Sequence, residues 1–328
     1  MQHSIFLVDD TPYCAWGWEL QKTNLEFLDH IDPTYFEYQA NTHFAKIDGE
    51  NKAQAATALR TSYHHGLESF FALICAALQA PDCVVGWFEK YQVYQIRKLV
   101  SIIASGSDPI SNKLGLGQVS WEGLSSRINK FAYPDDGKVR ETQQLFGKLW
   151  KRLAREFLEE VNTKEYNHIK HGARVKPGGF FLRCGEEHEE GVALSNEEMT
   201  SLGGSKFGTY FFIADRVKDA PRKKEADPHF RLIGHGVNWD PESLVHALCL
   251  IALSIQNVIS FLKIINGVSS KEVRFLRPED SDYFEQPWKR SVGVTSMSMD
   301  FYPVEEQHIT RYDARQLREQ SKINTSKK

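Results

Sequence analysis

The sequence lacks the short motifs that identify most common enzyme chemistries. No glycine loop of the kind that cradles phosphate precedes a helix, and no Gly-x-Ser-x-Gly turn presents a nucleophilic serine. The five cysteines are scattered and include no Cys-x-x-Cys pair, which argues against a zinc knuckle or a disulfide scaffold. The chain has no internal repeat and no low-complexity tract. Function must therefore be inferred from clusters of side chains.

The chain also has little net charge and no leader-like start. Its net charge is −3, so no global field recruits nucleic acid or anionic lipid, and any such binding needs a local patch. The first residues, MQHSIFLVDD, contain no basic leader, and acidic residues follow after only a few apolar ones. Hydrophobic residues make up 41% and charged residues 25%, as in soluble proteins. We expect a cytoplasmic protein.

One stretch, 240–267, organises the rest of the chain. Asp240 is suited to cap a helix, Pro241 suits its first position, and Gly267 suits its end. Apolar residues between them point in every direction around the axis, which predicts a buried helix. Polar residues interrupt the run, and no second apolar segment supports a membrane span. We expect the helix to be sheathed by others, without a membrane.

Periodicity predicts the remaining elements. Apolar residues at steps of three and four predict an amphipathic helix over 52–80, and further helices are predicted over 84–104, 120–131 and 138–175, the last with a break near 162–163. Strands are predicted over 4–8, 179–185, 207–217, 229–237, 271–277 and 291–302. The polar loop 219–227 and the tail after about residue 315 are expected to be mobile and frayed.

These elements predict an α+β fold that is mainly α. A helical bundle surrounds a buried central helix, and a small antiparallel sheet is inserted between the last two long helices, capping one end of the bundle. The predicted organisation is a wrapping segment with one short helix (1–50), a helical bundle (51–176), an inserted β region (177–240), the central helix (241–267) and a β-rich C-terminal segment with its tail (268–328).

Two short clusters carry side chains suited to chemistry. The first, Arg60-Thr-Ser-Tyr-His64-His65, lies in the 52–80 helix, and the second, Asn167-His-Ile-Lys-His171-Gly, ends a locally basic helix. Residues 138–176 hold ten Lys or Arg against five Glu and no Asp. A histidine near its ordinary pKa can move the 2′-hydroxyl proton of RNA, and an arginine can hold a phosphate.

Arg60-x4-His65 resembles the Arg-x4–6-His signature of HEPN domains, and Asn167-x-x-x-His171-Gly resembles the ending often seen in that motif. These domains are helical bundles of toxin–antitoxin and phage-defence proteins, and many are metal-independent ribonucleases that act as dimers. The resemblance implies that Arg60, His65 and His171 are catalytic, without a cofactor. Thr61 and Tyr166 depart from the family pattern.

The same resemblance implies a phosphate-binding cleft and a homodimer that binds or cleaves RNA in defence or stress response. The residues expected to contact the substrate are His64, Asn167, Lys170 and Arg174.

Other interpretations stay open. Arg60, His64 and Glu68 are spaced as an exposed ladder of polar partners on one helix face, and His171 suits the dipole at a helix end. A non-catalytic module could dock a protein partner through the sheet. The Phe residues of 180–212 could stack on bases, but we expect them to form the face of the sheet that packs on the bundle. Glu165-x-x-His168 matches half of a carboxylate-bridged di-iron site, which would make a metal-dependent enzyme.

Overall fold

The protein has an α+β fold that is mainly α, as the sequence predicts. A computed structural model describes residues 3–16, 19–132, 137–192, 194–216 and 230–299. The helices are α1 (Leu20–Asp29), α2 (Thr34–Phe44), α3 (Lys52–Gln79), α4 (Val84–Lys90), α5 (Val93–Ala104), α6 (Trp121–Ile128), α7 (Val139–Leu158), α8 (Glu160–Lys170), α9 (Pro241–Ile265) and α10 (Gln286–Lys289). The strands are β1 (His3–Val8), β2 (Thr11–Trp16), β3 (Lys176–Pro177), β4 (Phe181–Cys184), β5 (Thr200–Gly204), β6 (Gly208–Arg216), β7 (Phe230–Asn238) and β8 (Ser296–Met299).

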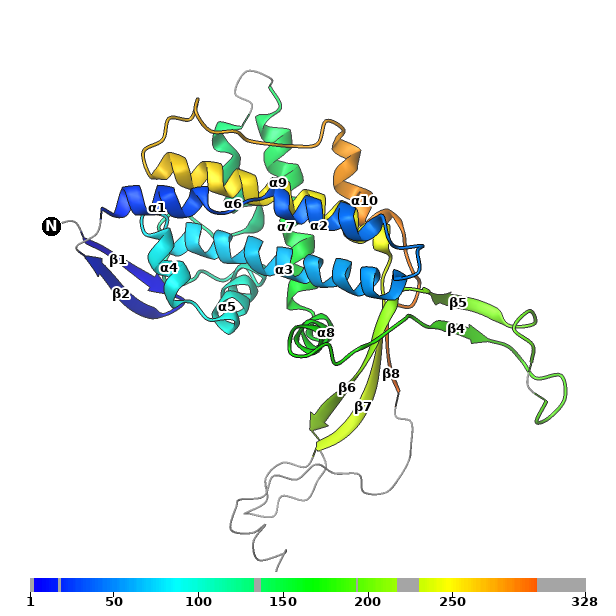
Figure 1. Cartoon of the computed structure of the whole chain (residues 1–328). Coiled ribbons are helices and arrows are strands. Elements are labelled where there is room, and N and C mark those ends of the chain that lie inside the picture. The colour runs from blue at the N-terminus through cyan, green and yellow to red at the C-terminus, as the bar shows by residue number, and fades with distance from the viewer. Residues whose placement is uncertain (1–2, 17–18, 133–136, 193, 217–229, 300–328) are drawn as a thin grey trace, which may run out of the picture.

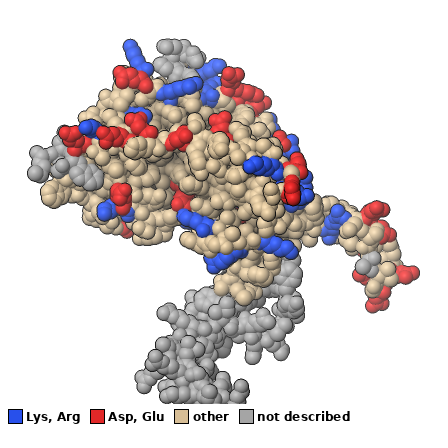
Figure 2. All heavy atoms as spheres, viewed as in Figure 1, with Lys and Arg blue, Asp and Glu red and all other residues tan. Residues whose placement is uncertain are grey.

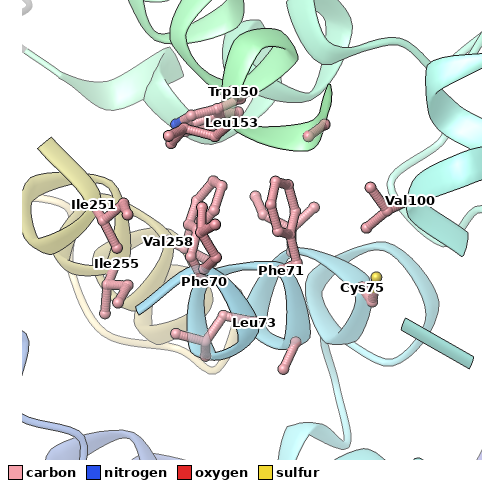
Figure 3. Packing of buried hydrophobic residues seen from close by; sticks show 14 of the residues in the cluster. Phe70, Phe71, Leu73, Cys75, Val100, Trp150, Leu153, Ile251, Ile255 and Val258 are labelled. Atoms are coloured by element: carbon pink, nitrogen blue, oxygen red, sulfur yellow. The ribbon is translucent and has the colours of Figure 1, made fainter. Parts of the chain in front are cut away.

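Helix α3 lies at the centre of the core together with α9. The sequence predicts α3 as amphipathic, but every residue from Phe70 to Ala80 is buried, so its second half is enclosed on all sides. Figure 3 shows Phe70 and Phe71 pointing toward Trp150 and Leu153 of α7. Helices α9, α2, α5 and α4 also pack against α3. Two central helices, rather than one, therefore carry the hydrophobic core.

Helix α9 begins and ends where the sequence predicts. The Asp240 carboxylate accepts a hydrogen bond from the backbone N–H of Ser243 at 2.9 Å, and Gly267 follows the helix with φ +92°. The helix contacts α1, α2, α3, α6 and α10. By length and composition α9 is apolar enough to cross a membrane, but 67% of its most apolar window is buried inside the molecule. This burial is consistent with the core helix of a soluble protein.

The β structure falls into three antiparallel sheets. Strands β1 and β2 form an N-terminal hairpin, β4 and β5 form a second hairpin, and four strands pair in the order β3-β6-β7-β8. The prediction of an inserted sheet is confirmed, because β3 to β7 all lie between α8 and α9. Figure 1 shows both the four-stranded sheet and the β4–β5 hairpin extending away from the helices. The sheet therefore presents a second face that the bundle does not cover.

Two predicted elements are wrong. The helix predicted over 84–104 is interrupted, because Gln92 is extended and caps α5 through a reciprocal bond with Gln95. The strand predicted over 271–277 is absent. Its backbone instead lies along α9, where the Asn257 amide bonds both the N–H and the C=O of Leu276, at 2.6 and 2.8 Å. Polar side chains of the helix thus take the place of a neighbouring strand.

Other boundaries shift by smaller amounts. The predicted strand 4–8 is confirmed within β1, and the wrapping segment contains two helices instead of one. The break in the long helical region falls at Glu159, three residues before the predicted position. The loop 219–227, the tail after residue 315 and the end of the strand predicted to 302 lie outside the described residues.

Candidate nucleic-acid interface

A buried polar cluster joins α3, α8 and the β region. Its centre is Glu165, which is 0% exposed. One carboxylate oxygen accepts hydrogen bonds from Arg60 Nε at 2.9 Å and from His64 Nε2 at 3.2 Å, and it lies 2.8 Å from Arg60 Nη2 in an ion pair. The other accepts from Thr209 Oγ1 at 2.5 Å and Trp239 Nε1 at 3.3 Å. Because a buried charge needs such partners, this cluster holds the sheet against the bundle.

The charges inside this cluster are strongly biased. Burial raises the pKa of Glu165, but the positive charge of Arg60 and the hydrogen bond from His64 outweigh it and lower that pKa to about 2. Burial, and then the charge of Arg60, lowers the pKa of His64 to about 4. At neutral pH, His64 is therefore an uncharged donor to the Glu165 carboxylate, and the ion pair is that of Arg60 with Glu165.

The predicted ladder of exposed residues on α3 is wrong. Arg60 and His64 are 5% and 6% exposed, because α8 covers this face of α3. Arg60 also donates to the Asn162 side chain at 2.9 Å. His65 is exposed and lies against the ring of Phe36 on α2, with ring centres 5.4 Å apart. Partial burial lowers the pKa of His65. The two members of the predicted catalytic pair thus have different surroundings.

The second cluster remains open to solvent. Asn167, Lys170, His171 and Arg174 are all exposed at the end of α8. Lys170 lies 3.7 Å from Glu68 of α3. The first and second clusters therefore lie side by side, but they meet through Glu165, Tyr166 and Lys170. His64 stacks on Tyr166 with ring centres 5.1 Å apart. Among the described residues, no hydrogen bond, ion pair or ring contact joins His65 to His171.

Four basic residues, Lys170, His171, Arg174 and Lys176, form what we call the basic strip. All four residues are exposed, and they run from the end of α8 into β3. Arg174, Lys176 and His171 form no ion pair with any residue in the described ranges. Figure 2 shows Lys and Arg side chains on the surface near α8 and the root of the sheet. The strip is thus a local positive patch on a chain whose net charge is −3.

The outer face of the four-stranded sheet carries aromatic residues that sequence reasoning assigned to the bundle side. That assignment is correct for Phe211, which is 1% exposed and contacts the ring of His168 on α8. It is wrong for Phe212, which is 57% exposed, because neighbours along a strand point to opposite faces. Tyr210, which is half-buried, lies on the same outward face as Phe212. The alternation of Thr209, Phe211 and Ile213 with Tyr210 and Phe212 was the available signal.

Glycines let rings lie flat on this outer face. A Cβ added at Gly234 would meet the Tyr210 hydroxyl at 2.0 Å, and one added at Gly236 would meet the Phe180 ring at 2.8 Å. Tyr210 and Phe212 pack edge to face with centres 5.3 Å apart. Lys176 pairs with Tyr210 across the strands and so lies on the same face. We call the side of the four-stranded sheet that carries Lys176, Phe180, Tyr210 and Phe212 the outer face.

A cavity of about 330 Å³ opens on the outer face. It is lined by Lys176, Phe180, Tyr210, Thr209, Pro177 and the backbone of Gly178, Gly179 and Gly236. Aromatic rings, one cation and bare glycine backbone are the components with which proteins hold an unpaired base and its phosphate. The cavity therefore suits one nucleotide of a single strand.

A larger cavity, of about 460 Å³, borders Arg60 but suits phosphate poorly. Arg60 is compensated by Glu165, and Arg290 in the same wall lies 2.7 Å from Glu242. The wall also contains one further arginine and three carboxylates, Arg155 against Glu156, Glu159 and Asp240. These leave an excess of negative charge, which repels a phosphate. Of these two cavities, the one on the sheet has the charge that is more favourable to a phosphate.

The described residues do not supply the second set of ligands that a di-iron site would need beside Glu165 and His168. Among the residues that the structure describes, no three His, Cys, Asp or Glu side chains gather as metal ligands. Glu165 is occupied by its hydrogen-bond donors, and His168 Nδ1 bonds the backbone carbonyl of Lys164 at 2.7 Å. Comparisons with protein-family models, with curated proteins and with solved structures found no match. The site must therefore be interpreted from its own chemistry.

Proposed function

We propose that this chain is a cytoplasmic protein that binds single-stranded nucleic acid on the outer face and the basic strip. The observation that carries the proposal is the outward orientation of Tyr210 and Phe212 on the same sheet face as Lys176. Bases stack on such rings with about 1–3 kcal/mol each, whatever their sequence. The adjoining cations meet the phosphates. The resemblance of the two histidine clusters to HEPN domains favours RNA, in a defence or stress response.

Binding is supported better than cleavage at Arg60 and His65. The Arg60 guanidinium is buried against Glu165 and Asn162, so a phosphate would have to displace a buried ion pair. His65 and His171 are exposed and remain the candidates for proton transfer. A degradation assay on wild type and a His65→Ala, His171→Ala variant tests this. We expect intact RNA with both proteins; cleavage by wild type alone would restore the nuclease interpretation.

The binding proposal is tested by Tyr210→Ala combined with Phe212→Ala. We expect affinity for a labelled oligouridine, measured by fluorescence anisotropy, to fall by at least about tenfold, since stacking on two rings is lost. The matched control is Tyr38→Ala with Tyr94→Ala, which removes two rings that are 64% and 66% exposed on the helical body. The proposal fails if the control weakens binding as much as the sheet variant does.

A comparison of oligouridine with oligothymidine then addresses the kind of nucleic acid. The 2′-hydroxyl is the group that distinguishes RNA from DNA at a given site. We expect tighter binding of the RNA. Equal affinities would leave single-strand binding intact and remove the preference for RNA.

A second candidate function is a protein-interaction module that works through the β region. The specific observation in its favour is the β4–β5 hairpin, which extends from the body with large apolar side chains exposed. Exposed apolar residues gathered on one projecting element are typical of docking surfaces. The hairpin lies outside the proposed nucleic-acid site of its own chain, so a partner bound to the hairpin leaves that site accessible unless the partner itself covers it.

A further inference from the structure

Residues 292–294 pack against the end of the β4–β5 hairpin nearest the body, where the Gly204 N–H donates to the Val292 carbonyl at 2.6 Å, but the hairpin leaves large apolar side chains exposed. We call residues 181–204 the arm, and Figure 1 shows its described residues, 181–192 and 194–204, extending to one side of the body. Phe181, Val192 and Leu202 are 56%, 55% and 52% exposed. A two-stranded hairpin is at best marginally stable in water by itself. A partner that covers these side chains would stabilise the arm.

The arm is also acidic. Residues 181–204 contain six glutamates and no Asp or Lys, against a single cation, Arg183. All six glutamates are exposed, and none forms an ion pair with another residue of the described ranges. Figure 2 shows acidic side chains gathered around the far end of the arm. A partner for this surface must therefore be basic as well as partly apolar.

The chain itself contains the complementary surface. The basic strip carries unpaired positive charge beside the apolar rings of the outer face. An arm cannot reach the strip of its own chain, because it starts at the strip, four residues after Pro177, and runs away from α8 (Figure 1). The strip that an arm can reach belongs to another copy.

We propose that the arm of each copy docks on the basic strip of a second copy, so that two chains exchange arms in a homodimer. Two-fold symmetry makes the same contact twice, which is the commonest arrangement in soluble oligomers. Complementary charges steer the encounter, and the apolar residues of the arm add burial. The docked arm covers the cations that the proposed nucleic acid also needs, so the two compete. The dimer itself does not depend on nucleic-acid binding.

Charge exchange between two variants tests the dimer without any nucleic acid. The first variant changes Glu186, Glu189 and Glu190 to Lys, and the second changes Arg174 and Lys176 to Glu. We expect wild type to show twice the 37.6 kDa mass of the chain in light scattering and to dissociate as salt is raised. Each variant alone brings like charges together and should be a monomer. An equal mixture restores both contacts and should form a dimer.

The matched control changes Glu50, Glu272 and Glu279 to Lys, which are exposed glutamates outside the arm. This control should remain a dimer, and circular dichroism of all variants checks that they are folded. A monomeric wild type, variants that stay dimeric, or a mixture that stays monomeric would each overturn the exchange. The stacking variant of Tyr210 and Phe212 retains every charge of the arm and the strip, so its failure to affect oligouridine would leave this result standing.

Discussion

Two residues on α8, only two positions apart, lie in opposite environments. Glu165 is 0% exposed and accepts hydrogen bonds from α3, from the four-stranded sheet and from Trp239. Asn167 is exposed, and the basic strip begins three residues after it. The buried side of the helix joins the bundle to the sheet, whereas its exposed end is available for binding. Substitutions on the first side should therefore change stability, and those on the second should change recognition.

The largest expected effect comes from Glu165→Gln. This change leaves Arg60 as an uncompensated buried charge, and we expect it to lower the free energy of unfolding by about 3–5 kcal/mol. Glu160→Gln is the matched control on the same helix, because its ion pair with Lys164 is 80% exposed on the Glu160 side. The control should change stability by less than about 1 kcal/mol. Urea denaturation measures both, and equal effects would remove the contrast between the two sides.

The next effect is a dependence of stability on pH. The pKa of His64 is about 4 in the folded protein against 6.5 ordinarily, so below pH 6.5 the unfolded chain binds a proton that the folded protein refuses. Stability should therefore fall as the pH is lowered from 6.5 to 4, by about 3 kcal/mol in total. The charges facing His64 are Arg60 from α3 and Glu165 from α8, and Tyr166 lies against its ring.

His64→Gln separates this contribution from other titrations. We expect the slope of unfolding free energy between pH 6.5 and 4 to become shallower in this variant, whatever its stability at neutral pH. His171→Gln, on the exposed side, should retain the wild-type slope. If the His64 variant keeps the full slope, the buried histidine is not its source.

The smallest expected effect lies in the salt dependence of binding. If Arg174 and Lys176 meet phosphates as proposed, replacing both with Ala should lower the slope of log affinity for oligouridine against log salt by about 1.4. Lys148→Ala with Lys271→Ala removes two exposed cations outside the strip and serves as the control. An unchanged slope in the strip variant would mean that the phosphates bind elsewhere, and the exposed end of α8 would then not be a binding surface.

The sequence predicts much of the helical framework because the signals are local. The cap at Asp240 and the apolar steps of the 52–80 helix act within a few turns, and α9 and α3 follow them closely. The alternation that separates Phe211 from Phe212 is equally local, but the prediction assigned both residues to the face that packs on the bundle, which is correct for Phe211 alone. The break at Gln92 depended on one reciprocal cap, which a run of apolar residues concealed.

The candidate site was less predictable because burial is a long-range property. Helical spacing places Arg60 and His64 on one face, yet only the packing of α8 encloses that face. The segment 271–277 reads as a strand, but Asn257 from α9 takes up its peptide groups instead. The residues around Arg60 and His64 do not indicate that α8 will cover them, and the segment 271–277 does not indicate that Asn257 will bind its backbone.

By itself, the sequence determined the α+β class, the ends of α9 and the presence of two histidine-bearing segments, because caps and apolar periodicity are encoded within each element. Only the tertiary structure decided which of these polar side chains are enclosed and which face solvent. The physical reason is that an ion pair such as Arg60 with Glu165 forms between residues over a hundred positions apart, where desolvation depends on the whole fold.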